Sequence, residues 1–296
     1  MKKAIAVILL AALCCSLPVL AGAEEPEIYT LLSPKGKVLT RYQGQCEKGD
    51  EYISGDNKHY RVTEVDESAH TARTELIGDA DMPDVGWLDQ VADATPVSAV
   101  ARKIALYCTH SDESYIEGDG TQSSEKRGGI YDVAAKFGAR LEELGATVER
   151  SEETHHPHDA GAYRRSRQTA VKLLKSQPNA IFDLHRDGIP DPEEYAVTIG
   201  GEKMSKVRLL VGKSNQNKEA NLSFAKQIKA VGDKLYPKLI KDIYMGKGTY
   251  NQDLAPRSVL LEFGTHTLSK VLLAERVLQP LQAVVAPIVK LIIGCD

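Results

Sequence analysis

From about residue 99 onward, short apolar runs alternate with amphipathic stretches, and this alternation constrains the fold more than any other feature. Apolar residues from Ile130 to Leu144 recur every three to four positions and are followed by Gly145. This spacing predicts a helix that ends at the glycine. Strands that alternate with helices favour a mostly parallel sheet with helices on both faces, an α/β fold. Further strands are expected at 101–106, 146–148, 180–184, 197–199, 207–211, 240–244 and 259–263, and further helices at 162–175, 217–236 and 268–293.

Residues 24–80 carry a different pattern, in which apolar and polar residues alternate in short runs. The runs are separated by turn sequences such as Pro34-Lys35-Gly36, which is typical of antiparallel strands. The sequence therefore predicts a small all-β domain at 24–80, a linker rich in Asp, Pro and Gly at 81–98, and the α/β domain at 99–296. The expected β strands are 28–32, 38–42, 51–53, 60–65 and 69–76.

The first 23 residues resemble an export signal. Two lysines precede an apolar run at 4–20, and small residues up to Ala23 offer a cleavage site. The alternative is an uncleaved membrane anchor, although the run is short for a span of about 20 residues and contains Pro18. We expect an exported protein. Its formal net charge of -4 argues against nucleic acid as a partner.

Three predicted strand ends carry polar groups that a buried strand should avoid. The carboxyl ends of neighbouring parallel strands form the usual site of α/β sheets, so these groups are expected to meet. His110 and Glu113, spaced as HxxE, can turn toward one point, and His185 follows another strand. A hydrolytic zinc ion takes three such ligands and keeps one open position, and two histidines with one glutamate are a common set. The alternative is that the histidines are hydrogen-bonded structural residues.

Other charged residues complete this expected site. Asp183 stands two residues before His185, so both side chains leave the same face of a strand, and the carboxylate can orient the imidazole. Glu262 ends an apolar run, where a carboxylate is costly unless it is paired or functional, and it is the candidate general base. Its alternative is a salt bridge to Arg257 or Arg186. Arg186 is the candidate catalytic cation, for an oxyanion or a substrate carboxylate.

Four segments occur in one order and resemble the stage II sporulation protein P family, which comprises zinc-dependent peptidoglycan amidases of sporulating bacteria and their relatives. The segments are THSDESY, AYRRSRQT, FDLHRDG and TYNQDLAPRSVLLEFG, and the resemblance covers roughly residue 103 to the C-terminus. It implies a zinc amidase-like or carboxypeptidase-like fold, a Zn²⁺ cofactor, and cleavage between N-acetylmuramic acid and the L-alanine of the stem peptide. Cleavage within peptide cross-links is also attributed to the family. Its members commonly act beside a lytic transglycosylase and its membrane partner.

Carried over to this sequence, the resemblance places His110 and His185 in the metal site and Glu262 in catalysis. Glu113 is the glutamate of the first motif. Glu125 is the alternative ligand, because the wider amidase group places a ligand glutamate at the start of the first helix. The expected contacts to glycan or peptide are Tyr163, Arg164, Arg167, Asn251, Gln252 and Asp253.

The first motif departs from the family pattern, because Cys108 stands where the family usually has histidine. We expect Cys108 to be a small buried strand residue, with thiolate ligation of zinc as the alternative. The stretch HHPHD at 155–159 is either a solvated loop or a second metal site, and the resemblance places His155 at the substrate groove.

We therefore predict a zinc amidase of the cell wall. A zinc carboxypeptidase or endopeptidase acting on wall peptides is the first alternative, and a non-catalytic peptidoglycan-binding protein is the second.

Overall fold

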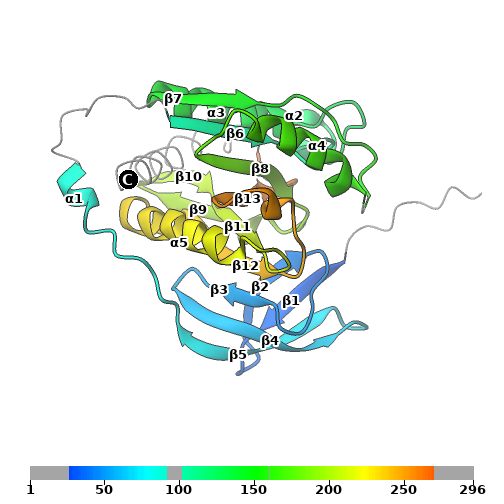
Figure 1. Ribbon diagram of the computed structural model, residues 1–296. Helices are drawn as coiled ribbons and strands as arrows, with labels where there is room; N and C mark the ends of the chain where they lie inside the picture. Colours follow the sequence, from blue (N-terminus) through cyan, green and yellow to red (C-terminus); the bar gives the residue numbers. More distant parts are fainter. Residues whose placement is uncertain (1–26, 92–101, 160, 270–296) are drawn as a thin grey trace, which may run out of the picture.

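The computed structural model describes residues 27–91, 102–159 and 161–269. The main element of these segments is an eleven-stranded sheet in the order β2-β1-β5-β4-β3-β12-β11-β13-β8-β6-β7, and β9 and β10 form a separate hairpin (Figure 1). No helix in the described segments is long and apolar enough to cross a membrane. The strands are β1 (Ile28–Leu32), β2 (Val38–Gln43), β3 (Glu51–Ile53), β4 (Lys58–Asp66), β5 (Thr71–Asp79), β6 (Arg102–Tyr107), β7 (Ala146–Arg150), β8 (Ala180–Asp187), β9 (Ala196–Ile199), β10 (Glu202–Ser205), β11 (Val207–Gly212), β12 (Ile240–Gly246) and β13 (Ser258–Thr265). The helices are α1 (Leu88–Val91), α2 (Ile116–Asp119), α3 (Ile130–Glu143), α4 (Ala162–Leu174) and α5 (Lys218–Leu235), with short 3-10 turns η1 (Pro192–Glu194) and η2 (Gln252–Leu254).

The second half of the sheet is mostly parallel, which confirms the predicted fold class. Strands β13, β8, β6 and β7 are parallel neighbours. Strand β11 is parallel to β12 and antiparallel to β13, so the direction reverses once. Strand β8 is longer than expected and continues through Asp187, which places His185 inside a strand, where its orientation is fixed.

The first five strands extend the same sheet. Strands β1 and β3 have the predicted bounds, and the predicted turn at Gly36 has a φ of 75°, a conformation that glycine adopts without strain. Strand β3 pairs antiparallel with β12, with Tyr52 opposite Tyr244. A separate small all-β domain is therefore not confirmed.

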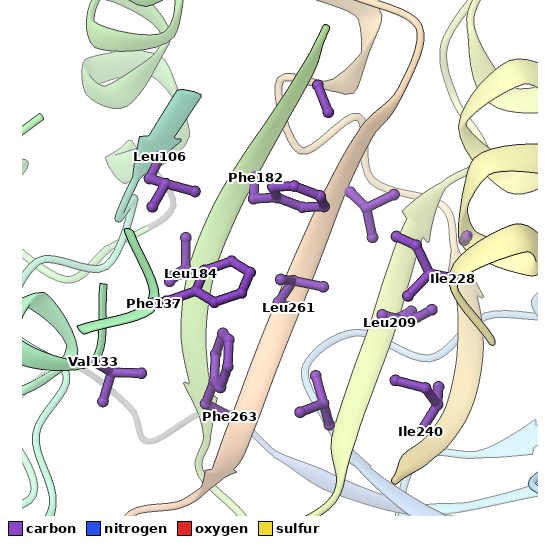
Figure 2. Packing of buried hydrophobic residues seen from close by; sticks show 14 of the residues in the cluster. Leu106, Val133, Phe137, Phe182, Leu184, Leu209, Ile228, Ile240, Leu261 and Phe263 are labelled. Carbon is purple, nitrogen blue, oxygen red and sulfur yellow. The ribbon is translucent and has the colours of Figure 1, made fainter. Parts of the chain in front are cut away.

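One face of the sheet packs against α3 and α5. Alternate residues of β8, such as Phe182 and Leu184, point to this face and belong to one apolar cluster with Phe137 of α3 and Ile228 of α5 (Figure 2). The rings of Phe137 and Phe182 meet edge to face, with centroids 6.3 Å apart. Burial of each large apolar side chain contributes about 1.5–3 kcal/mol, so this apolar layer is a main source of stability.

The opposite face is covered by α4 and by the N-terminal strands. Ala170 and Leu173 of α4 pack on Tyr107 and Ile181. Farther along the sheet, residues of β1 and β2 form a second apolar cluster with residues of β11, β12 and β13. Helices on both faces are confirmed. Because strand residues alternate, Asp183, His185 and Glu262 emerge on this second face, between the two covers.

Several predictions lie outside the described residues. They are the export signal at 1–23, the part of the linker at 92–98, and the helices expected at 270–293. The described part of the predicted linker ends in α1, whose Leu88 belongs to the main apolar core.

Candidate metal centre

The structure brings two of the three polar strand ends together directly. In the parallel pair β8 and β13, His185 stands opposite Glu262. In the parallel pair β6 and β8, Tyr107 stands opposite Asp183, so the loop that follows Tyr107 begins beside His185. The carboxyl ends of β6, β8 and β13 therefore share one site, as expected from the sheet.

His110, Glu113 and His185 form one cluster, in which each residue offers one ligand atom and these atoms lie within 4.8 Å of one another. Glu113 Oε1 lies 3.3 Å from the Nδ1 atoms of both histidines. Glu113 Oε2 accepts a hydrogen bond of 2.8 Å from the backbone N–H of Arg186. Two imidazoles and one carboxylate are a donor set typical of hydrolytic zinc. Glu125, the alternative ligand, is exposed and does not belong to this cluster.

The loop after β6 turns back so that His110 and Glu113 face the same point. The backbone N–H of Glu113 donates to the carbonyl of His110, and the Glu113 carbonyl accepts from Ile130 at the start of α3. Gly128 packs directly on this loop, because a Cβ there would overlap the carbonyl oxygen of Glu113 and the backbone of Asp112. Only glycine allows this close approach without a shift of the loop.

Asp183 connects this loop to His185. Its carboxylate accepts hydrogen bonds from the backbone N–H of Thr109 at 2.8 Å and from the Thr109 hydroxyl at 2.6 Å. Asp183 Oδ1 also lies 3.0 Å from His185 Nε2, which has no aligned hydrogen-bond partner within the described residues, so this contact is electrostatic. The predicted orienting carboxylate is thus next to the imidazole.

The electrostatics of the cluster favour a charged Glu113, a neutral His110 and a protonated His185. Burial opposes the charge of Glu113, but His185, His110 and Arg186 hold its pKa well below the ordinary value. Burial lowers the pKa of His110 and outweighs the effect of Glu113. Burial also opposes the charge of His185, but Asp183 and Glu113 raise its pKa well above the ordinary value. Ionised carboxylate and neutral imidazole are the forms that bind a metal ion, so a metal ion would displace the His185 proton.

Glu262 lies opposite His185 in the neighbouring strand and forms no ion pair within the described segments. Its Oε2 atom is buried without a hydrogen-bond partner. Burial and the nearby charge of Asp187 raise the Glu262 pKa to about 8, although His185 and Arg208 act in the opposite direction. The salt-bridge alternative does not hold here, because Arg257 donates to the backbone carbonyl of Asn179 and Arg186 donates to the backbone carbonyl of Gln122.

Arg186 and Cys108 also have defined surroundings. The Arg186 guanidinium donates to the carbonyl of Gln122 at 3.0 Å, and its Nε atom is buried without a partner. Cys108 is buried in the main apolar core, where burial raises the pKa of its thiol well above the ordinary value. Cys108 is therefore a buried residue, as expected, and it is not one of the donors of the cluster.

The predicted substrate residues differ in their surroundings. The Tyr163 ring lies 5.5 Å from the His110 ring and is nearly parallel to the His185 ring at 6.4 Å. Arg164 is exposed. The other four are engaged within the protein: Arg167 forms a two-point ion pair with Asp253, Asn251 donates to Tyr163 and Ser166, and Gln252 bonds to the backbone of Leu210 and Gly212. Substrate contact by these four stays a prediction.

Two contributions to the site were missed in the sequence. In the HHPHD stretch, His158 lies against His110, whereas His155 is buried and bonded to Cys108 and Thr169. The second contribution comes from β2. The Gln43 amide packs where a Cβ on Gly188 would lie, and Tyr42 stacks on Tyr244 with ring centroids 3.9 Å apart. The histidine-rich stretch was a usable signal for His158, but no local pattern pointed to β2.

The sheet and the cluster place this chain among α/β proteins with a candidate metal centre of two histidines and one carboxylate. The Stage II sporulation protein P family model matches residues 23–275, and the chain belongs to this family. Stage II sporulation protein P of Bacillus subtilis (strain 168) is 32% identical over 180 residues, which cover 54% of this chain and 45% of that protein. The match therefore spans less than half the length of this relative.

Solved structures with a similar arrangement include two N-acetylmuramoyl-L-alanine amidases. AmiC2 of Nostoc punctiforme is 12% identical with a TM-score of 0.41, and the match covers 65% of this chain and 97% of the AmiC2 chain. The amidase of Clostridium difficile 630 is 10% identical with a TM-score of 0.42, and the match covers 67% of this chain and 100% of that amidase chain.

Proposed function

We propose that this chain is a zinc-dependent peptidoglycan hydrolase that cleaves the amide between N-acetylmuramic acid and the L-alanine of the stem peptide. The observation that supports this most is the His110–Glu113–His185 cluster, with Glu262 opposite His185 in the neighbouring strand. Membership of the stage II sporulation protein P family supports peptidoglycan as the substrate.

The donor set fits zinc, because Glu113 Oε1 lies 3.3 Å from Nδ1 of both histidines, and Glu262 Oε2, in the strand beside His185, is buried without a hydrogen-bond partner among the described residues. His110, Glu113 and His185 would hold the ion. When bound at such a centre, zinc polarises the scissile carbonyl and lowers the pKa of water toward about 7. Glu262 accepts a proton from the attacking water and returns it to the alanine nitrogen.

The neighbouring residues orient the reacting groups. Asp183 keeps the His185 ring in place and, through Thr109, the loop that carries His110. The Arg186 guanidinium, anchored on the Gln122 carbonyl, supplies positive charge for an oxyanion or a substrate carboxylate.

The test is digestion of purified peptidoglycan by the purified protein, with and without a chelator, followed by mass spectrometry of the released fragments. Free stem peptides that begin at alanine, lost with chelator and restored by zinc, are expected. Shortened peptides that stay attached to glycan would assign a peptidase instead. Binding without any metal-dependent release would support a non-catalytic peptidoglycan-binding protein.

Export and partnership belong to the same proposal. N-terminal sequencing of the protein from cells is expected to show cleavage after Ala23, in agreement with the signal-like first 23 residues. The proposed partner is a lytic transglycosylase with its membrane partner, and copurification with this chain would test it.

A further inference from the structure

Asn251 lies in a turn between β12 and β13 whose backbone is strained. Its φ of 56° and ψ of 8° are left-handed, and Tyr250 before it has a φ of 49°. Asparagine tolerates this conformation, but a tyrosine rarely adopts it. The turn also packs closely on the end of β11, because a Cβ on Gly212 would overlap the carbonyl oxygen of Gly248. Strained backbone persists only where the surrounding structure holds it, and it clusters at functional sites.

Both hydrogens of the Asn251 amide nitrogen are used within the fold. Nδ2 donates to the carbonyl of Tyr163 at 3.1 Å and to the hydroxyl of Ser166 at 3.0 Å. Both partners belong to α4, and the Tyr163 ring lies beside the rings of His110 and His185. Asn251 is 5% exposed, and Ser166 is 0% exposed. The amide nitrogen therefore holds the start of α4 and has no hydrogen left for a substrate.

Ser166 continues this contact toward the cluster of proposed ligands. Its hydroxyl oxygen lies 2.8 Å from the hydroxyl oxygen of Thr109, which lies 2.6 Å from Asp183 Oδ2. Because a carboxylate oxygen only accepts, Thr109 gives its one hydroxyl hydrogen to Asp183, and Ser166 supplies the hydrogen between the two hydroxyls. Thr109 and Asp183 are buried. A continuous chain of hydrogen bonds thus runs from Asn251 to Asp183, whose Oδ1 lies 3.0 Å from His185 Nε2.

We propose that Asn251 is a positioning residue of the metal centre. Its amide acts through Ser166 and Thr109 on Asp183. Asp183 in turn holds the orientation of the His185 imidazole. This inference rests on the proposed function, because it takes His185 as a zinc ligand. Outer partners of a ligand histidine typically contribute about 10- to 100-fold to metal affinity or activity. A residue that contacts the substrate would instead raise KM and leave the affinity for zinc unchanged.

Asn251→Gly removes the amide and keeps a residue that suits the left-handed turn. The matched control is Asn57→Gly between β3 and β4, because Asn57 also has a positive φ, of 61°, and its amide donates to Asp233 of α5 instead. The measurements are zinc affinity by chelator competition, Tm, and kcat and KM for release of stem peptides at saturating zinc.

Substitutions along the chain of bonds show whether the hydroxyls transmit the effect. Ser166→Ala interrupts the chain in its middle with the smallest change in volume. Thr109→Val removes the hydroxyl with little change in shape, whereas Thr109→Ser keeps the hydroxyl and loses only a methyl group.

Asn251→Gly, Ser166→Ala and Thr109→Val are expected to weaken zinc binding about 10- to 100-fold and to lower kcat, with KM near that of wild type. Thr109→Ser and Asn57→Gly should stay within about threefold of the wild-type zinc affinity. Wild-type zinc affinity in Asn251→Gly would overturn the inference, and a raised KM in that variant would make Asn251 a substrate contact. If Asn251→Gly does not fold, wild-type zinc affinity in Ser166→Ala overturns it. An equal loss in Thr109→Ser and Thr109→Val would do so as well, because the hydroxyl would then have no part in the effect.

Failure of the proposed function has a different signature. Wild-type protein that binds zinc but releases no stem peptide would overturn the proposed hydrolysis, whereas the zinc affinities of the variants would still decide the role of Asn251. Wild-type protein that binds no zinc would overturn both proposals.

Discussion

Arg208 and Asp242 form an ion pair that is almost completely buried on the sheet face that also carries His185. Arg208 Nε lies 2.7 Å from Asp242 Oδ1, and the two side chains are 1% and 0% exposed. The same guanidinium donates to Asp187 at the end of β8 and to Thr40 in β2. One arginine thus connects the N-terminal strands to the strand that carries His185 of the candidate metal centre.

Removal of one partner of this pair is expected to be costly, because it leaves a buried charge without compensation. We expect Asp242→Asn to lower the free energy of unfolding by about 3–5 kcal/mol, measured by denaturant titration. The matched control is Glu143→Gln, which removes the exposed ion pair of Glu143 with Arg140 and should cost less than about 1 kcal/mol. Equal effects of the two substitutions would contradict this assignment.

The same pair predicts how stability depends on acid pH. Burial opposes the charge of Asp242, but Arg208 and Lys241 lower its pKa from 3.8 to about 2. A carboxyl whose folded-state pKa is depressed contributes stability above its ordinary pKa and loses it as pH falls through the folded value. The shift corresponds to about 2 kcal/mol, lost between about pH 4 and pH 2. Unfolding free energies across this range should fall less steeply in Asp242→Asn than in wild type.

The carboxylate ligand can be tested directly through zinc affinity. Glu113 Oε1 lies 3.3 Å from both candidate histidine ligands, whereas Glu125 is exposed and outside the cluster. We expect Glu113→Gln to weaken zinc binding at least about 100-fold in a chelator competition. Glu125→Gln, with the same change in charge, should stay within about twofold of wild type. The reverse order would make Glu125 the ligand.

Glu262→Gln tests the proposed general base separately from the metal. The amide keeps the size of the carboxyl group but cannot take a proton, so release of stem peptides should fall by about 100- to 10,000-fold. Zinc content should remain that of wild type, because Glu262 does not belong to the donor cluster. Undiminished turnover in this variant would exclude Glu262 as the base.

Much of the fold was predictable because local pattern and final structure agree. The alternation in residues 28–32 and 51–53 indicated β1 and β3 with their observed bounds, and the apolar run before Glu262 indicated β13. The donor cluster was predictable for the same reason. His110 and Glu113 follow β6 and His185 lies near the end of β8, and the rule that parallel strand ends meet places them together.

What escaped prediction depends on contacts between residues far apart in sequence. Nothing in the sequence of β3 or of β12 indicates that these two strands pair. The N-terminal strands were therefore expected to form their own domain. Asn251 and Gln252 look like loop residues available to a ligand, but the structure uses their amides for backbone and side-chain groups of neighbouring elements. A polar side chain that hydrogen bonds to a buried backbone group and one that is free to bind substrate look the same in the sequence.

Gly128 gives a final test of how the fold positions the proposed metal ligands. A Cβ at this position would overlap the Glu113 carbonyl oxygen, so Gly128→Ala must displace the loop that carries His110 and Glu113. We expect weaker zinc binding and lower turnover, measured by chelator competition and peptide release. The control is Gly145→Ala after α3, where φ is 85° and nothing lies near the added Cβ. That change should cost about 1 kcal/mol of stability through backbone strain and leave zinc binding unchanged. If Gly128→Ala binds zinc as tightly as wild type does, the close packing of Gly128 on this loop does not hold the ligands in place.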